Sequence, residues 1–168
     1  MSEAGMGTEQ KVVVVTGASQ GFGAGLVKAY RDRNYRVIAN SRSIKPSKDS
    51  DVLTIAGDVA DPKTADRIVQ EGLTRFGRID TLVNNAGIFI AKPLVDYTEE
   101  DYASILATNL GGFFRITKRV AVEMLKQGVG SHRADYDQPY RSRQQQRSLG
   151  SCLDDQRWPK RSHEVLGD

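Results

Sequence analysis

The stretch Lys11–Gly23, which reads KVVVVTGASQGFG, decides the fold of this chain. Its valine run is β-branched and has no polar alternation, which is typical of a strand buried on both faces of a parallel sheet. The glycines that follow permit a tight turn. From Gly21 to Arg33, the spacing of Leu26, Val27 and Tyr30 predicts a helix with one apolar side. We interpret the stretch as the strand, turn and helix that open an α/β sheet.

Strands and helices continue to alternate beyond this unit. Asp61 followed by Pro62 is typical of a helix start, and Thr98 with Asp101 resembles a capping box. Three further strands are predicted over Tyr35–Asn40, Val52–Ala56 and Ile79–Asn84, and two further helices over Pro62–Phe76 and Asp101–Gln127. The alternation predicts an α/β fold: a Rossmann-type, doubly wound parallel sheet, truncated after the fourth strand and its following helix.

The turn after the first strand has the composition of a phosphate-binding loop. A dinucleotide pyrophosphate is held by free backbone N–H groups at a helix N-terminus, and glycines let the backbone approach it closely. The flanking strand and helix are the context that such a fingerprint requires. An ordinary glycine-rich connection is the alternative. The predicted nucleotide contacts in this turn are Gly17, Ser19, Gln20, Gly21, Phe22 and Gly23.

The composition changes near Gly128. The segment after it has few hydrophobic residues and contains the only Cys, the only Trp and both His. It shows no sustained period of 2 or 3.6, and it cannot bury enough apolar area to offset the entropy of ordering. We therefore expect a flexible N-terminus over residues 1–10, a partial dinucleotide-binding domain over 11–127 and a disordered tail over 128–168.

The pattern TGxxxGxG at Thr16–Gly23 resembles that of the short-chain dehydrogenase/reductase family, and later segments agree with it. The resemblance covers about residues 9–127, which correspond to the N-terminal half of a member. Asp58-Val59 follows the third predicted strand, Asn84-Asn85-Ala86-Gly87 ends the fourth, and Asn109 lies in the long helix. The resemblance implies adenine contacts by Asp58 and Val59, a cofactor site lined by Asn85, Ala86 and Gly87, and a catalytic role for Asn109.

Each of these polar residues also has a purely structural alternative. Asp58 is alternatively a turn or helix-capping aspartate, because Asp side chains bind nearby backbone N–H groups. Asn84 and Asn85 alternatively satisfy loop backbone groups, a role that is compatible with cofactor contact. Asn109 is alternatively a surface residue of its helix.

The end of the second predicted strand bears on the choice of cofactor. An enzyme that uses NAD places Asp or Glu there to accept from the ribose 2′-OH, whereas a 2′-phosphate favours a cation. The sequence has Asn40-Ser41-Arg42, with an arginine and no acid. NADP is therefore favoured over NAD, with Arg42 as the phosphate-binding residue; a solvated surface charge is the alternative for Arg42.

The resemblance implies an NAD(P)-dependent oxidoreductase that transfers hydride between the cofactor and a small carbonyl or alcohol substrate. In the family, a serine, a tyrosine and a lysine four residues after the tyrosine complete the catalytic group. No tyrosine of this chain has a lysine at that position. We expect the chain as written to be truncated and inactive, with a non-catalytic nucleotide-binding remnant or the product of a frameshifted gene as alternatives.

A frameshift would account for the tail. If Val129–Arg133 are encoded GTC GGG TCA CAT CGT and a G follows, a shift of one base gives Ser-Gly-His-Ile-Val, which resembles the start of the family's fifth strand. The same offset over Gln156–Gly167 permits a segment that resembles the one beginning at the catalytic lysine. We therefore hypothesise that the tail is a frameshifted form of the missing half.

Composition limits the remaining classes of function. No apolar run is long enough to span a membrane, and the first ten residues do not resemble a signal peptide. A single cysteine favours a reducing, cytoplasmic location. The net charge is +3, but basic and acidic residues alternate, so no nucleic-acid partner is expected. A membrane partner and a metal site are not expected either. The resemblance implies that intact relatives form homo-oligomers, and we expect an exposed apolar face of the long helix to make this chain prone to aggregate.

Overall fold

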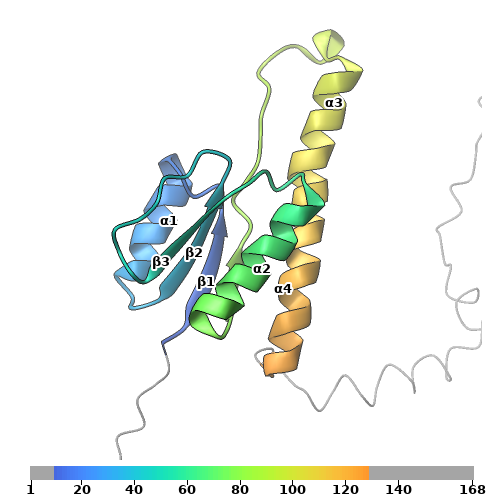
Figure 1. Ribbon diagram of the computed structural model, residues 1–168. Helices are drawn as coiled ribbons and strands as arrows, with labels where there is room; N and C mark the ends of the chain where they lie inside the picture. Colours follow the sequence, from blue (N-terminus) through green and yellow to red (C-terminus); the bar gives the residue numbers. More distant parts are fainter. Residues whose placement is uncertain (1–9, 129–168) are drawn as a thin grey trace, which may run out of the picture. The chain divides into compact units, whose positions relative to one another are not determined.

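The computed structural model describes residues 10–128, so the predictions for residues 1–9 and for the tail from residue 129 lie outside the described part. Figure 1 shows the elements in their colours along the chain. In chain order they are β1 (Val12–Thr16), α1 (Gly21–Arg31), β2 (Arg36–Ser41), β3 (Val52–Ala56), α2 (Pro62–Phe76), β4 (Thr81–Val83), the 3-10 turn η1 (Leu94–Asp96), α3 (Glu99–Ile105), the π-helical segment η2 (Leu106–Gly112) and α4 (Phe113–Gln127).

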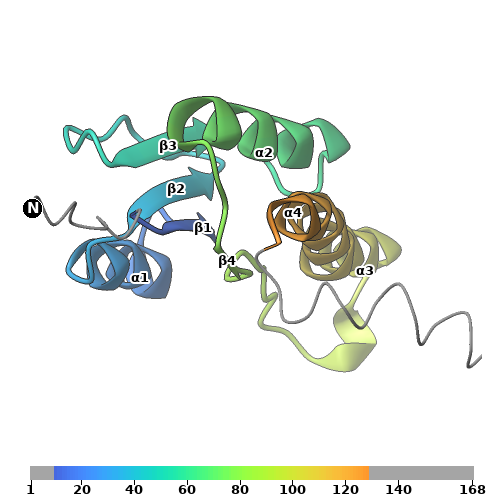
Figure 2. The same ribbon diagram turned by 90° about the horizontal axis from the view of Figure 1, so that it is seen from below.

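The strands form one parallel sheet in the order β3-β2-β1-β4. β1 is central, and it pairs Val14 with Ile38 of β2 on one side and with Leu82 of β4 on the other. The chain runs outward from β1 to β2 and β3, and then returns to place β4 on the opposite side of β1. Figure 2 shows α1 on one face of the sheet and α2 and α4 on the other. This arrangement confirms the Rossmann-type, doubly wound sheet.

Each face of the sheet has its own hydrophobic cluster, because alternate side chains of a strand point to opposite faces. On the first face, Val13 and Val15 of β1 pack with the apolar side predicted for α1: Leu26, Val27 and Tyr30. The second face joins the sheet to α2 and α4 through Val12, Val14, Ile38, Ile55, Ile68, Val69, Phe76, Ile116 and Val120. The core thus fixes both helix layers against β1 and β2.

Strand β4 is shorter than the predicted range of residues 79–84. Ile79 is fully buried but precedes the strand. The backbone N–H of Val12 donates to the Asp80 carboxylate at 2.8 Å, so at this point a side chain takes the place of a ladder carbonyl. Arg78 pairs with the same carboxylate at 2.5 Å. Regular pairing with β1 therefore begins only after Asp80.

The long helix predicted from Asp101 to Gln127 is continuous but changes type along its length. The capping box of Thr98 and Asp101 opens it, as predicted. A π-helical segment, η2, separates α3 from α4, and such segments are frequent at functional sites. Ile116 and Val120 bury one side of α4 in the core. A second apolar side, formed by Leu106, Leu110, Phe113, Phe114, Val122 and Leu125, is exposed within the described residues.

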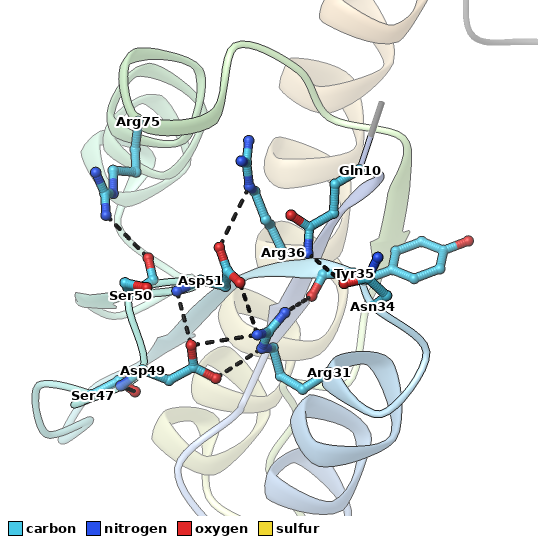
Figure 3. A network of polar contacts seen from close by, with 10 residues as sticks. All are labelled: Gln10, Arg31, Asn34, Tyr35, Arg36, Ser47, Asp49, Ser50, Asp51 and Arg75. Carbon is cyan, nitrogen blue, oxygen red and sulfur yellow. Dashed lines mark hydrogen bonds and ion pairs between the residues drawn. The ribbon is translucent and has the colours of Figure 1, made fainter. Parts of the chain in front are cut away.

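A polar network holds the opposite, amino-terminal edge of the sheet (Figure 3). Arg31, at the end of α1, donates to Asp49 at 2.8 Å, to Asp51 at 2.9 Å and to the carbonyl of Tyr35 at 2.5 Å. The Asp49 hydrogen bond raises the pKa of the Arg31 guanidinium, and Arg31 in turn lowers the pKa of the Asp49 carboxyl. The network ties the segment before β3 to the end of α1.

Candidate nucleotide-binding site

A cavity of about 380 Å³ lies at the carboxyl ends of the strands. In open α/β sheets, ligands bind at this edge, where the order of the strands reverses. All the residues that the sequence predicts for the cofactor line the cavity: Gly17, Ser19, Gln20, Gly21, Phe22, Gly23, Arg42, Asp58, Val59, Asn85, Ala86 and Gly87. The lining also includes Asn40, Ser41, Ser43, Gly57, Ile88 and Thr108, which sequence reasoning missed although most of them adjoin predicted residues.

The turn between β1 and α1 requires its glycines for different reasons. Gly17 and Gly21 have φ of +66° and +54°, a region that residues with a Cβ rarely adopt. A Cβ on Gly23 would lie 2.1 Å from the carbonyl oxygen of Gly17, so only glycine fits there. A Cβ on Gly21 would meet nothing within 4 Å. The turn is therefore closely packed below Gly23 and open at Gly21.

The N-terminus of α1 lacks the side-chain cap that opens α2 and α3. Gln20 makes no capping hydrogen bond, whereas Asp61 caps α2 and Thr98 caps α3. The first turn of a helix has N–H groups without intrahelical partners, and its dipole favours an anion. Gln20, Gly21, Phe22 and Gly23 line the cavity, so these donors adjoin it.

Asn85 joins the ends of β1 and β4 beneath the cavity. Its Nδ2 donates to the carbonyls of Thr16 and Gly17 at 3.0 and 3.1 Å. The buried hydroxyl of Thr16 accepts from the backbone N–H groups of Asn85 and Ala86 at 3.1 and 3.0 Å. Asn85 therefore satisfies loop backbone groups, as its structural alternative proposed, and it also lines the cavity.

The opposite wall is formed where β2 and β3 end. Asn40 is fully buried, and its Nδ2 donates to the carbonyls of Ile55 and Gly57 at 2.9 and 3.1 Å. Its Oδ1 and the Ser41 hydroxyl are buried without a hydrogen-bond partner in the described part of the chain. Asp58 accepts from the N–H of Ala60 at 2.9 Å, which is the turn role of its alternative. Asp58 nevertheless lines the cavity beside Val59.

Arg42 is exposed and lines the cavity on the side of β2. A second cavity of about 520 Å³ adjoins it on the α1 face and shares Ser19, Gln20 and Ser43 with the first. Lys45 lines this second cavity. Arg42 and Lys45, both in the loop after β2, thus line two adjoining cavities that also share residues of the glycine-rich turn.

Asn109, in η2, does not line the cavity, although its neighbour Thr108 does. Both ends of its amide bind one loop residue: Nδ2 donates to the Ile88 carbonyl at 2.9 Å, and Oδ1 accepts from the Ile88 N–H at 2.8 Å. Asn84 donates to the Thr117 hydroxyl of α4 at 2.9 Å. Both asparagines therefore attach the segment after β4 to the long helix.

The loop beyond Ile88 is tied to the start of α3. Lys92 and Asp101 form an ion pair, and the hydroxyl of Tyr97 donates to the carbonyl of Ile90. The hydrogen bond from Lys92, followed by that from the Thr98 N–H, lowers the pKa of Asp101 to about 2. These contacts hold a loop on which Phe89, Leu94 and Val95 are strongly exposed.

Between residues 10 and 128, no helix is long and apolar enough to cross a membrane. In the same range, no group of three or more His, Cys, Asp or Glu side chains is arranged to hold a metal ion.

The fold defines a Rossmann-type α/β protein, and comparison with known proteins gives its family. A profile of the short chain dehydrogenase family matches residues 11–131. The chain belongs to this family. An uncharacterized oxidoreductase of Thermotoga maritima is 35% identical over 134 residues, which are 74% of this chain and 53% of that protein. A 3-oxoacyl-[acyl-carrier-protein] reductase of Escherichia coli is 34% identical over 131 residues, with 74% and 54% covered.

Solved structures give the same result. A 3-ketoacyl-(acyl-carrier-protein) reductase from Brucella melitensis, complexed with NADH, matches with a TM-score of 0.67 at 28% identity and covers 71% of this chain and 52% of its own. A short chain dehydrogenase from Leptospira borgpetersenii with bound NAD+ matches with a TM-score of 0.65 at 28% identity, covering 71% and 48%. This chain therefore spans about half the length of the relatives it matches.

Proposed function

We propose that the chain binds NADP in the cavity at the carboxyl edge of its sheet, as the nucleotide-binding part of an oxidoreductase of this family. The observation that carries the proposal is the uncapped N-terminus of α1 facing a glycine-lined cavity. A pyrophosphate satisfies the free N–H groups of such a turn and interacts favourably with the helix dipole. The open space at Gly21 leaves room for it.

Two observations favour NADP over NAD. Arg42 and Lys45 lie on the border where the ribose 2′-phosphate would be held, and the hydroxyl of Ser41 is buried there without a partner in the described residues. Among the described residues that line the cavity, the only carboxylate is that of Asp58, on the wall formed after β3. A cation stabilises a 2′-phosphate, whereas recognition of the free 2′-OH uses an acid at the end of β2.

The proposed chemistry is hydride transfer to a small carbonyl or from an alcohol. When bound, the nicotinamide supplies or accepts the hydride. In this chain, Gly17–Gly23 bind the pyrophosphate, Asp58 and Val59 line the adenine side, and Asn109 fixes the loop at Ile88. No tyrosine in the sequence has a lysine four residues later to exchange the proton. We therefore propose that the 168-residue chain binds the cofactor but does not turn over by itself.

A binding measurement tests the choice of cofactor. We expect NADPH to bind the full chain more tightly than NADH in a fluorescence titration. Arg42→Ala should weaken the binding of NADPH roughly tenfold, which is the loss expected for one charge-assisted contact. It should leave the binding of NADH unchanged. Lys48→Ala removes a cation from the same loop outside both cavities and serves as the control. Equal binding of the two cofactors to all three proteins would contradict the choice of NADP; no binding at all would overturn the function.

A turnover assay tests the absence of catalysis. NADPH oxidation with a panel of ketones should stay at the rate of the buffer blank. Turnover that disappeared in Tyr136→Phe or Tyr140→Phe would show that a tyrosine of the tail donates the proton, and the proposal of an inactive chain would then be wrong. Resequencing of the gene across the codons for Lys126–Ser131 tests the frameshift that underlies this proposal.

The same proposal extends to location and partners. A single cysteine in 168 residues is consistent with a reducing compartment, and we place the protein in the cytoplasm. Nucleic acid and membranes are not among its proposed partners. We propose that intact relatives form homo-oligomers. In this chain the second apolar side of the long helix is exposed within the described residues, so we propose that the chain tends to aggregate.

A further inference from the structure

The turn over residues 57–60, which forms one wall of the cavity, is held from two directions. At its start, Gly57 donates to the carbonyl of Ser41 at 3.1 Å and accepts from Asn40 Nδ2 at 3.1 Å. At its end, the carbonyl of Ala60 accepts from Nη1 of Arg115, on α4, at 3.1 Å. Ala60 in turn donates to Asp58 at 2.9 Å. A continuous chain of hydrogen bonds therefore runs from Arg115 through Ala60 to Asp58, which lines the cavity.

The helix approaches this turn closely because η2 ends in two glycines. A Cβ on Gly112 would lie 2.8 Å from Cγ2 of Val59 and 3.2 Å from the Val59 carbonyl oxygen. A Cβ on Gly111 would lie 2.7 Å from Nη1 of Arg115. Glycine within a helix is destabilising relative to alanine. Here the close contact with Val59 explains the glycine at position 112, and the space taken by the Arg115 guanidinium explains the glycine at position 111.

From this geometry we infer that Arg115 is a positioning residue for nucleotide binding: it holds the Asp58–Ala60 turn in place without touching the nucleotide. Arg115 is not among the residues that line either described cavity. Asp58 and Val59 do line the cavity, and their turn joins β3 to α2 beyond the last paired residues of β2 and β3. The inference rests on the proposed function, because it concerns affinity for the proposed ligand.

Arg119 provides a matched control on the same helix. It lies one turn further along α4 and donates to Asp66 of α2 at 2.6 Å, so it joins α4 to α2 itself and not to the turn. Arg115→Ala, Arg115→Lys and Arg119→Ala should be prepared in the full chain. Adenosine 2′,5′-bisphosphate and NADPH are suitable probes, because both carry the adenine that this wall would contact.

We expect Arg115→Ala to weaken the binding of both probes about tenfold and Arg119→Ala to change it less than twofold. The affinity of Arg115→Lys should lie in between. The dependence of affinity on salt should be unchanged in Arg115→Ala, since the guanidinium acts on a backbone carbonyl and not on a phosphate. Without ligand, amide exchange at Ala60 and Asp61 should be faster in Arg115→Ala only. If Arg115→Ala does not fold, Arg115→Lys is compared with Arg119→Ala in the same measurements.

The outcomes separate this inference from the proposed function. Equal affinity of the Arg115 and Arg119 variants, while the parent chain binds both probes, would overturn the inference and leave the function standing. A flatter salt dependence in Arg115→Ala would instead identify Arg115 as a phosphate contact and overturn the positioning role. If the parent chain binds neither probe, the function itself is wrong and the inference falls with it.

Discussion

Gly23 and Gly25 lie two residues apart on α1, yet the structure places different demands on them. Gly23 is buried under the turn, where a Cβ would lie 2.1 Å from the Gly17 carbonyl oxygen. Gly25 is exposed, and a Cβ there would meet nothing within 4 Å. The two glycines look alike in the sequence, but close packing requires glycine at position 23, whereas position 25 has room for a side chain.

This difference predicts opposite effects of the same substitution. Gly23→Ala should destabilise the chain by about 1–3 kcal/mol or more, because backbone must shift to admit the methyl group. Gly25→Ala should stabilise it by about 1 kcal/mol through helix propensity. Urea unfolding followed by circular dichroism measures both. Equal effects of the two substitutions would contradict the packing described at Gly23.

At this scale, the sequence predicts what local chemistry determines. The glycine-rich turn and the residues after β3 and β4 all lie where the sequence indicated, because strand ends and turn residues have local signatures. The roles of Ser41 and Arg115 had no such signature. Arg115 contacts a carbonyl 55 residues earlier in the chain, and its contact exists only because α4 packs beside the turn after β3.

Among the elements, the loop between β2 and β3 is held at its far end by the side chain of Arg31. It leaves the cavity edge at Ser41 and returns to the opposite edge, where Arg31 holds it through Asp49 and Asp51 (Figure 3). The Arg31 side chain is only 22% exposed, so its ion pairs are partly shielded from solvent. No local pattern in the sequence indicates this network, because it joins residues about 20 positions apart that only the fold brings together.

Removal of this side chain should be costly compared with an ordinary surface pair. Arg31→Ala loses two ion pairs and a hydrogen bond to Tyr35, and we expect a destabilisation of about 1–2 kcal/mol. Lys28→Ala removes the exposed Lys28–Asp32 pair of the same helix and should cost at most about 0.5 kcal/mol. Thermal unfolding of both variants in low salt tests the difference, and similar losses would show that the network contributes no more than a surface pair.

The start of α3 should respond to acid. The hydrogen bonds from Lys92 and from Thr98 lower the pKa of Asp101 from its ordinary 3.8 to about 2, so the folded state favours the carboxylate. This contribution to stability is present above pH 3.8 and is lost as the pH falls through about 2. The difference in melting temperature between the parent chain and Asp101→Asn should therefore shrink between pH 4 and pH 2. A constant difference over that range would show that the carboxylate charge is not involved.

For the molecule as a whole, the long helix has two apolar sides with different surroundings. Ile116 and Val120 pack into the core, whereas Leu110 and Phe114 are 60% and 61% exposed. The open edge of β4, which pairs with β1 on one side only within the described residues, offers backbone hydrogen-bonding groups as a separate means of association. Apolar surface of this kind favours association.

Polar substitution on the exposed side should improve solubility without loss of stability. Leu110→Ser with Phe114→Ser is expected to raise the soluble fraction and lower the binding of a hydrophobic dye. Val120→Ala, on the buried side of the same helix, should instead destabilise the chain by about 2 kcal/mol. An unchanged soluble fraction in the double variant would mean that this face does not drive association. The sequence predicted an exposed face but not its division from the buried side, because that division depends on where α2 packs.

The two hydrogen bonds between Asn109 and Ile88 imitate the exchange between neighbouring backbones. A carboxamide is chemically a peptide group, and here it offers a loop residue the donor and acceptor that an adjoining strand would offer. Aspartate lacks the donor, leucine lacks both groups, and glutamine carries its amide one methylene further away. These two hydrogen bonds therefore constrain position 109 through loop architecture, so we expect an asparagine here to persist even in a homologue that had lost all enzymatic activity.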